Sequence, residues 1–251
     1  MATSVSDRIA ALPPFPDIDF SEFGEVEVKP LSRIQKLTGA FLSRNWVAIP
    51  HVTHHDEVDV TDAEDRRHTL SRDQNVKLTP VVFLIKALAR VLAQFPQFNA
   101  SLSADGQSLV YKKFVHIGVA VDTPGGLLVP VLRDCDRKDL ATIAGELSAI
   151  AEKARTKGLA MQEMMGSSMS ISSIGHIGGT AFTPIVNAPD VAILGSTAIQ
   201  LRPAPAADGS IAWRKMLPLS LSYDHRVING ADAARFVRAI GAALADPALV
   251  G

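Results

Sequence analysis

The most apolar stretch of the chain, residues 80–95, constrains the fold more than any other segment. Its apolar residues recur at helical spacing and form one stripe: Val82, Ile85, Leu88, Ala89 and Leu92. Phe95 and Pro96 mark the end of this helix. Lys86 and Arg90 interrupt the stretch, which is also too short to span a bilayer. We therefore expect a helix buried in the core of a soluble domain.

Composition sets the class of protein. The 251 residues are 47% hydrophobic and 20% charged, so the chain can bury a full core without a metal or a disulfide framework. A net charge of -1 argues against nucleic acid as a partner. Cys135 is the only cysteine, which suits a reducing compartment and excludes an intramolecular disulfide and a thiolate zinc cluster. The first residues lack a secretory signal pattern, so we expect a cytoplasmic protein that does not enter a membrane.

The beginning of the chain differs in character from the rest. Residues 1–24 hold three prolines and little periodic pattern, which predicts a linker or extended arm ahead of one domain over residues 25–251. The apolar residues near the end of this arm need a surface to lie on: Phe15, Ile18, Phe20 and Phe23.

Hydrophobic periodicity predicts a mixture of helices and strands. Helical spacing predicts helices at residues 31–46, 80–94, 139–157 and 231–244. Alternation and β-branched runs predict strands at residues 51–60, 114–121, 127–132, 169–173, 191–196 and 213–223. Residues 122–126 are rich in turn formers and predict a hairpin between two of these strands. The irregular alternation favours an α/β protein with a mixed-sheet sandwich over a strict doubly wound fold.

Common catalytic fingerprints are missing from the sequence. It contains no dinucleotide-binding glycine motif, no phosphate loop, no hydrolase elbow and no zinc-protease motif. His51, His54 and His55 lie beside acidic residues, but strand alternation puts them on two faces, which favours a polar strand face over a metal site. Residues 66–68 form a small basic patch that could receive phosphates, although such runs are usually solvated faces.

Polar residues interrupt two apolar strand ends. Residues 170–175 end a strand in two hydroxyls before a glycine-rich stretch, which is also the pattern of an ordinary serine-rich turn. Residues 219–230 place Asp224, His225, Arg226 and Asn229 between a strand and a helix. Because imidazole can accept a proton near neutral pH, catalysis is slightly favoured there over a simple capping loop.

Residues 224–232, Asp-His-Arg-Val-Ile-Asn-Gly-Ala-Asp, resemble the catalytic signature of the dihydrolipoamide acyltransferases, the E2 cores of 2-oxo acid dehydrogenase complexes. Further segments resemble the same family in order along the chain: residues 20–24, 42–46, 49–53, 122–127 and 171–175. Residues 182–189 are more similar to the pyruvate branch than to the oxoglutarate or branched-chain branches. The implied acyl group is acetyl, with a pyruvate complex and a related acetoin complex both left open.

The resemblance implies a reaction and roles for three residues. An acetyl group would pass between the thiols of dihydrolipoamide and coenzyme A, both bound as substrates, on a chloramphenicol-acetyltransferase-like fold without a metal. By family position, His225 is the general base that removes the thiol proton. Ser173 is the matched hydroxyl that stabilises the tetrahedral oxyanion. Asn229 stands where the family most often has Asp, and its role in the catalytic loop is left open.

Family positions also imply contacts with coenzyme A, and among them Arg67 is the clearest phosphate partner. The implied residues are Arg67, Thr79, Asp122, Ser172 and Ser173.

The resemblance further implies an assembly. His225 of one chain would serve Ser173 of another in a homotrimer, and trimers would build a 24-subunit cubic core with the arm packed on a neighbour. The lipoyl group would be carried on a domain absent from this chain, and upstream domains would bind the E1 and E3 components of the complex.

Two other functions stay open at this point. One is a small-molecule O-acetyltransferase of the chloramphenicol type, which shares the histidine but not the long run of matching segments. The other is a non-catalytic scaffold that uses the fold only for assembly, although an intact His225 and Ser173 argue against it.

Overall fold

The structure, a computed structural model, describes residues 15–206 and 208–249, so residues 1–14 of the predicted arm lie outside the described part. The helices are η1 (Phe20–Glu22), α2 (Arg33–Ala48), α3 (Thr61–Asp73), α4 (Pro80–Leu92), η2 (Pro96–Phe98), α5 (Leu140–Thr156), η3 (Met161–Glu163), α6 (Gly230–Ala245) and η4 (Pro247–Leu249). The strands are β1 (His51–Asp59), β2 (Ala100–Leu102), β3 (Leu109–Tyr111), β4 (Ile117–Val119), β5 (Val121–Thr123), β6 (Gly126–Leu128), β7 (Val131–Leu132), β8 (Met169–Ser173), β9 (Ala192–Ser196), β10 (Gln200–Pro205) and β11 (Ile211–Asp224).

One mixed sheet organises the chain, with the strand order β1-β11-β9-β8-β4-β7 and β10 paired to the first half of β11. The pairs β4–β8 and β8–β9 are parallel, whereas β1–β11, β11–β9 and β4–β7 are antiparallel. Two short hairpins, β2–β3 and β5–β6, stand outside this sheet. The predicted mixed-sheet α/β architecture is confirmed.

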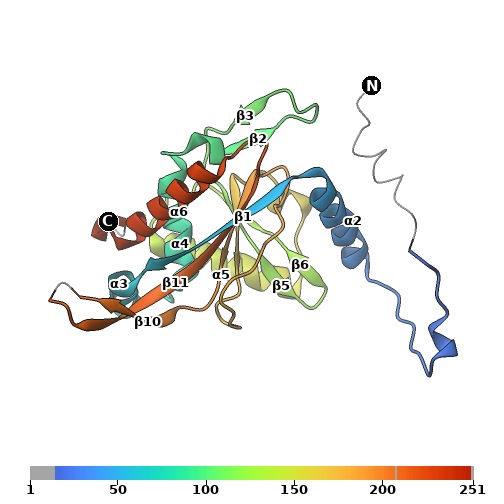
Figure 1. Ribbon diagram of the computed structural model, residues 1–251, viewed down its shortest axis with the longest axis horizontal. Coiled ribbons are helices and arrows are strands. Elements are labelled where there is room, and N and C mark those ends of the chain that lie inside the picture. Colours follow the sequence, from blue (N-terminus) through green and yellow to red (C-terminus); the bar gives the residue numbers. More distant parts are fainter. Residues whose placement is uncertain (1–14, 207, 250–251) are drawn as a thin grey trace.

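Helices cover one face of the sheet (Figure 1). Helix α6 packs on β1 and β11, and α4 packs between α6 and α5. Alternate residues of β11 point into this core, where Leu219, Leu221 and Tyr223 are at most 1% exposed. They meet the apolar side of α6, which includes Phe236 and Ile240. The period of two along the strand and the period of 3.6 along the helix thus bring two apolar faces together.

The opposite face of β11 carries small polar residues that are also buried. Ser220 and Ser222 lie there, at most 1% exposed, and hydrogen-bond to residues of β1: the hydroxyl of Ser222 lies 2.8 Å from that of Thr53. The segment between β8 and β9 covers this face and comes so close that a Cβ on Gly195 would lie 2.7 Å from Cζ of Phe182. Burial on both faces explains why the second half of β11, residues 217–223, is a run of apolar and small polar residues.

Local sequence signals account for the helix boundaries. Ser32 caps α2 in a capping box with Gln35, and the Asp139 carboxylate caps α5 by accepting from the Thr142 N–H. Helix α4 begins with Pro80 at its first position, where the missing N–H has no cost. Among the described residues, no helix is long and apolar enough to cross a membrane.

The predicted helices and strands are confirmed with boundaries shifted by up to two residues at most ends, whereas three features differ. The predicted 114–132 hairpin is present but divided, because β5–β6 forms its tip and β4–β7 forms its base in the main sheet. Helix α3 was not predicted, because its sequence is polar and buries only Ala63 and Glu64. The short strands β2, β3 and β10 were also missed.

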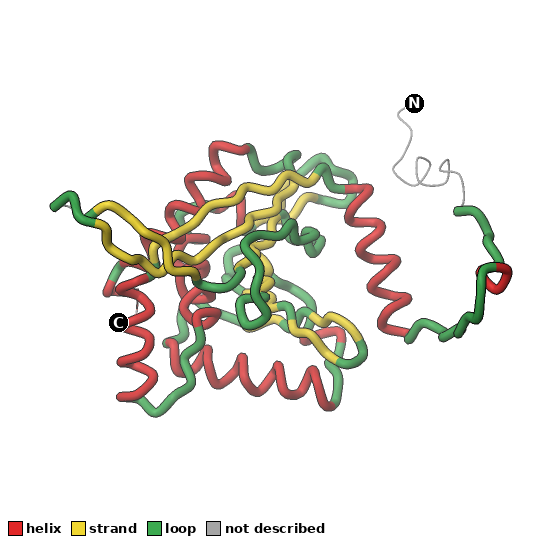
Figure 2. Tube along the Cα trace, turned by 60° about the horizontal axis from the view of Figure 1, so that its bottom comes forward, coloured by secondary structure: helices red, strands yellow, loops and turns green. Residues whose placement is uncertain are grey.

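Helix α2 and residues 15–32 before it lie at the side of the domain in both views (Figures 1 and 2), and α2 joins the body through its buried Asn45 and through contacts with β6. Phe15, Phe20 and Phe23 are 99%, 65% and 78% exposed, and Leu37 and Trp46 of α2 are also largely exposed. Several large exposed apolar side chains in one part of a chain are typical of a surface that binds another molecule.

A glycine pair tests this packing. Gly195→Ala should lower the free energy of unfolding by about 1–3 kcal/mol, because the new methyl group would overlap Phe182. Gly145→Ala is the matched control in α5, where a Cβ would meet no atom within 4 Å, and it should raise stability by about 0.5–1 kcal/mol. Denaturant unfolding of both variants measures the difference, and equal effects would contradict the close approach.

Candidate active site

The turn between β11 and α6 presents His225 at the surface. Strand β11 ends at Asp224, and the backbone N–H of His225 donates to the carbonyl oxygen of Pro50 at 3.1 Å, which ties the turn to the start of β1. The imidazole is exposed, and its ring centre lies 5.8 Å from that of the buried Tyr223. The main chain of His225 is therefore fixed while its side chain is free to meet another molecule.

Asp224 and Arg226 form an ion pair across His225. The Asp224 side chain is 4% exposed, and the Arg226 guanidinium binds it through Nε to Oδ1 at 2.9 Å and Nη2 to Oδ2 at 2.6 Å. The Arg226 backbone N–H also donates to Oδ1 at 3.0 Å. The hydrogen bonds with the Asp224 carboxylate raise the pKa of the Arg226 guanidinium above its usual value. The sequence pattern around His225 includes both residues but assigns neither a role.

Asn229 is the N-cap of α6. Its side-chain oxygen accepts from the Asp232 backbone N–H at 3.0 Å, and its side-chain nitrogen donates to Oδ2 of Asp232 at 2.7 Å. This arrangement satisfies an N–H group that the first turn of a helix leaves without a partner. The structure therefore gives Asn229 a definite structural position next to the His225 turn.

The predicted serines lie at the end of β8. Ser172 and Ser173 are half-buried, and β4 ends beside them because it runs parallel to β8. Asp122 follows on β5 beyond the same end of that pair, where it is exposed. The structure thus brings Asp122, Ser172 and Ser173 to one end of the sheet. Their contact with coenzyme A stays a prediction.

Ser173 and His225 of one chain lie at opposite ends of the sheet. Ser173 is in register with Ser196 of β9, which is in register with Leu219 of β11. His225 lies six residues beyond Leu219 along the chain. At the rise per residue of an extended strand, Ser173 and His225 are therefore roughly 20 Å apart along the strand direction. A hydrogen-bonded relay between these two side chains cannot form within one chain.

Arg67 lies on α3 and its side chain reaches Leu78, the residue before Thr79, which is the N-cap of α4. The Arg67 guanidinium donates to the carbonyl oxygen of Leu78 at 2.7 Å and to both carboxylate oxygens of Glu64. Its side chain is 12% exposed, so its charge already has a partner, and a phosphate would have to share it with Glu64. The contact of Arg67 with coenzyme A stays a prediction.

The other histidines do not form a cluster. His51 accepts from the Val186 N–H at its Nε2, and its Nδ1 lies 2.9 Å from the Ile49 carbonyl oxygen, so the ring joins two loops. Among the described residues, no group of three or more His, Cys, Asp or Glu side chains could hold a metal ion. Burial raises the pKa of Cys135 to about 11, which makes this thiol a poor nucleophile.

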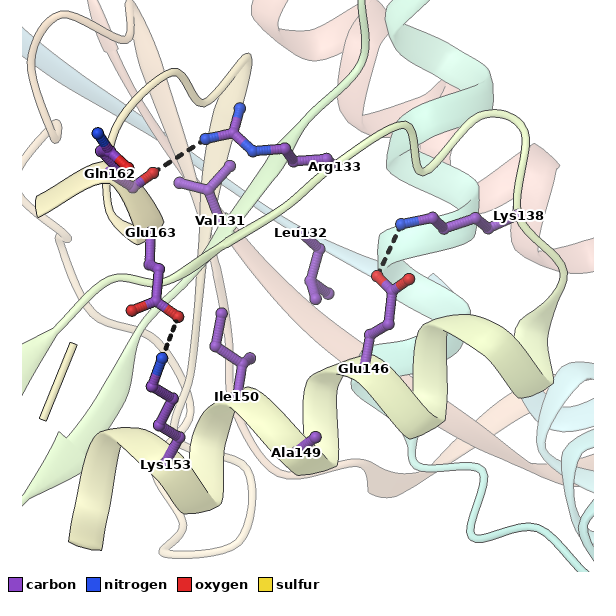
Figure 3. A pocket seen from close by; sticks show the side chains of 10 residues that line it. All are labelled: Val131, Leu132, Arg133, Lys138, Glu146, Ala149, Ile150, Lys153, Gln162 and Glu163. Carbon is purple, nitrogen blue, oxygen red and sulfur yellow. Dashed lines mark hydrogen bonds and ion pairs between the residues drawn. The ribbon is translucent and has the colours of Figure 1, made fainter. Parts of the chain in front are cut away.

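Two of the hollows on the described part of the chain differ in whether they adjoin the His225 turn. The larger one, about 640 Å³, lies between α5 and the edge strand β7, with Lys138–Glu146 and Lys153–Glu163 ion pairs at its sides (Figure 3). It contains none of the predicted site residues. The smaller one, about 320 Å³, lies beside the His225 turn, and Asp224 and Arg226 form part of its wall.

The fold places the chain in a structural class, and the sequence match then places it in a family. The chain superimposes on a chloramphenicol acetyltransferase with a TM-score of 0.55 at 14% identity over 84% of this chain and 95% of that one, which shows a shared fold. Residues 23–251 match the catalytic domain of the 2-oxoacid dehydrogenase acyltransferases. The chain belongs to this family, and the resemblance found in the sequence is confirmed.

Individual relatives come from pyruvate dehydrogenase complexes. The acetyltransferase component from Pseudomonas aeruginosa is 52% identical over 94% of this chain, and that from Haemophilus influenzae is 50% identical over 93%. The chain spans 44% and 42% of the lengths of these two relatives. A structure of the dihydrolipoamide acetyltransferase from Azotobacter vinelandii matches with a TM-score of 0.91 at 49% identity, covering 96% of this chain and all of that one. A structure described as the cubic core of the pyruvate dehydrogenase complex matches equally well.

The cap provides a test of the role of Asn229. Asn229→Ala should cost about 1 kcal/mol, since it removes the acceptor for the Asp232 N–H, and should lower the Tm by about 2–4 °C. Asn229→Asp keeps that acceptor but loses the donor to Asp232, so its Tm should fall between those of the wild type and the alanine variant. Thermal unfolding of the assembled proteins measures the order, and an unchanged Tm for Asn229→Ala would contradict the cap.

Proposed function

We propose that the chain transfers an acetyl group between dihydrolipoamide and coenzyme A as the catalytic core of a pyruvate dehydrogenase complex. The observation that carries this proposal is the match to the acyltransferase family over residues 23–251 together with about half-identity to acetyltransferase components. The Azotobacter vinelandii structure comes from work on the roles of a serine, a histidine and an asparagine in its catalytic mechanism. These are the residue types of Ser173, His225 and Asn229.

The chemistry assigned to His225 is removal of the thiol proton. A thiol is mostly protonated at neutral pH and is a weak nucleophile, so a base that accepts its proton during attack accelerates the reaction. An exposed imidazole on a fixed backbone suits this task, because it can approach a substrate without moving the turn. When the tetrahedral intermediate collapses, the imidazolium gives the proton to the departing thiolate, which leaves as the product thiol.

Ser173 is assigned to the oxyanion. Attack on a thioester carbonyl places a negative charge on oxygen, and a preorganised hydroxyl donor stabilises it by a hydrogen bond that is absent in the ground state. Ser173 receives no acetyl group in this scheme. Ser172, Asp122, Thr79 and Arg67 are proposed to line the coenzyme A side.

The complete site is proposed to form between two protomers of a trimer. The register of β8, β9 and β11 supports this, since Ser173 and His225 are too far apart to cooperate within one chain. The exposed apolar surface of the arm and α2 supports it as well, because association would cover Phe15, Phe20, Phe23, Leu37 and Trp46.

The proposal for the larger assembly is based on the solved structure of a relative. Trimers are proposed to build a 24-subunit cubic core, since a solved cubic core shares the fold at a TM-score of 0.91. Dihydrolipoamide would arrive on a lipoyl domain, and domains outside the matched region would bind the E1 and E3 components in the cytoplasm. The relatives are more than twice as long as this chain, which leaves room for such domains.

Variants of the two proposed catalytic residues test the reaction. With acetyl-CoA and free dihydrolipoamide, His225→Ala should remove nearly all transfer, because the group proposed to accept the thiol proton is lost. Ser173→Ala should lower turnover roughly 100-fold, which is the usual effect of losing one oxyanion donor. Both variants should assemble as the wild type does, which sedimentation or size-exclusion chromatography measures.

The outcomes also separate the alternatives. An assembled wild type that acetylates alcohols but not dihydrolipoamide would favour an O-acetyltransferase of the chloramphenicol type. An assembled wild type without any transferase activity would favour a scaffold. Activity retained by His225→Ala would remove the assignment of the base.

Mixing the two inactive variants tests where the site forms. Co-expression of the His225→Ala and Ser173→Ala chains should restore activity, because about one in four sites of a randomly mixed trimer would combine an intact histidine from one chain with an intact serine from its neighbour. Each variant alone is the control. A site contained in one chain would gain nothing from mixing.

A further inference from the structure

We propose that Arg226 is a positioning residue whose planar guanidinium holds the turn that aims His225. The inference rests on the proposed role of His225 as the base and concerns the group that fixes its direction.

The contacts on both sides of His225 define a closed turn. The Asp224 carboxylate accepts from the Arg226 backbone N–H at 3.0 Å, so the main chain bends back on itself with His225 as the middle residue. The Arg226 guanidinium then closes the same gap through its side chain. Because the side chains of Asp224 and Arg226 are joined to one another, the imidazole is left to project away from the pair.

The rest of the turn is anchored to the sheet. The Asp224 N–H donates to the Val191 carbonyl oxygen at 2.8 Å, and the Asp224 carbonyl oxygen accepts from the N–H groups of Val227 and Ile228. Asp224 therefore links β9, the turn and the start of α6. Arg226 is the partner that keeps this buried carboxylate in one orientation.

The geometry of the pair matters beyond its charge. A buried carboxylate needs compensation, which any cation could supply. Two nearly parallel N–H···O contacts at 2.9 and 2.6 Å also fix the plane of the carboxylate, and only the guanidinium can make them. Lysine at position 226 would keep the charge and lose the planar fork.

The decisive variant is therefore Arg226→Lys, measured in the full assembled chain. We expect wild-type assembly and a wild-type thermal midpoint, KM values for acetyl-CoA and dihydrolipoamide within about twofold, and kcat at least about 10-fold lower, since small misplacement of a catalytic group has a large effect on rate. Arg238→Lys is the matched control, because Arg238 lies on α6 and makes a single 3.0 Å contact with Asp56. Its kcat should equal that of the wild type.

A second variant covers the case in which Arg226→Lys does not assemble. The double variant Asp224→Asn, Arg226→Gln removes both charges and leaves no buried carboxylate without a partner, while the asparagine oxygen still accepts from the backbone N–H of residue 226. It should assemble and show the same fall in kcat with unchanged KM values. Wild-type kcat in an assembled Arg226→Lys chain, or in the double variant, would overturn the proposal. So would equal changes in KM and kcat.

The same assay series keeps this inference apart from the proposed function. An inactive wild type or an active His225→Ala chain would show that the proposed reaction or base is wrong. If the wild type is active, His225→Ala is inactive and Arg226→Lys keeps the wild-type kcat, only the positioning role is wrong.

Discussion

The pairing of β11 with β9 on one side and β1 on the other is the constraint on which the rest of the structure depends. It buries the second half of β11, from Leu217 to Asp224, inside the sheet and fixes where each neighbouring strand ends. Through β9 it also sets the position of β8, so Ser173 and His225 are directed to opposite ends. The distribution of functional groups follows from strand register and not from loop conformation.

This arrangement explains why neither surface hollow of the single chain contains both proposed catalytic residues. Ser173, half-buried, and His225, exposed, lie at opposite ends of the sheet. Apolar side chains before and along α2 are exposed in the same chain. Both features fit the proposal that the site is completed by a second protomer, and a relative of about half-identity is part of a cubic core.

Sequence patterns predicted the parts of the fold in which periodicity and burial agree. Helix α4 could be predicted because one side of it is apolar along its whole length. The β5–β6 turn could be predicted because its residues favour tight turns. Helix α3 could not, since it is held by Arg67–Glu64 and by contacts with β11 that appear only after folding. The site residues came from family resemblance, but the ion pair of Asp224 and Arg226 became visible only as a contact across the turn. Register between distant strands, which separates Ser173 from His225, has no local sequence signal.

The buried position of Cys135 has a consequence for a protein proposed to handle two thiol substrates. It is the only cysteine in the chain, it is fully buried, and its raised pKa keeps it protonated. The thiol of Cys135 is therefore not positioned to compete with either proposed thiol substrate for the acetyl group. Its burial also keeps it from forming a mixed disulfide with a substrate thiol.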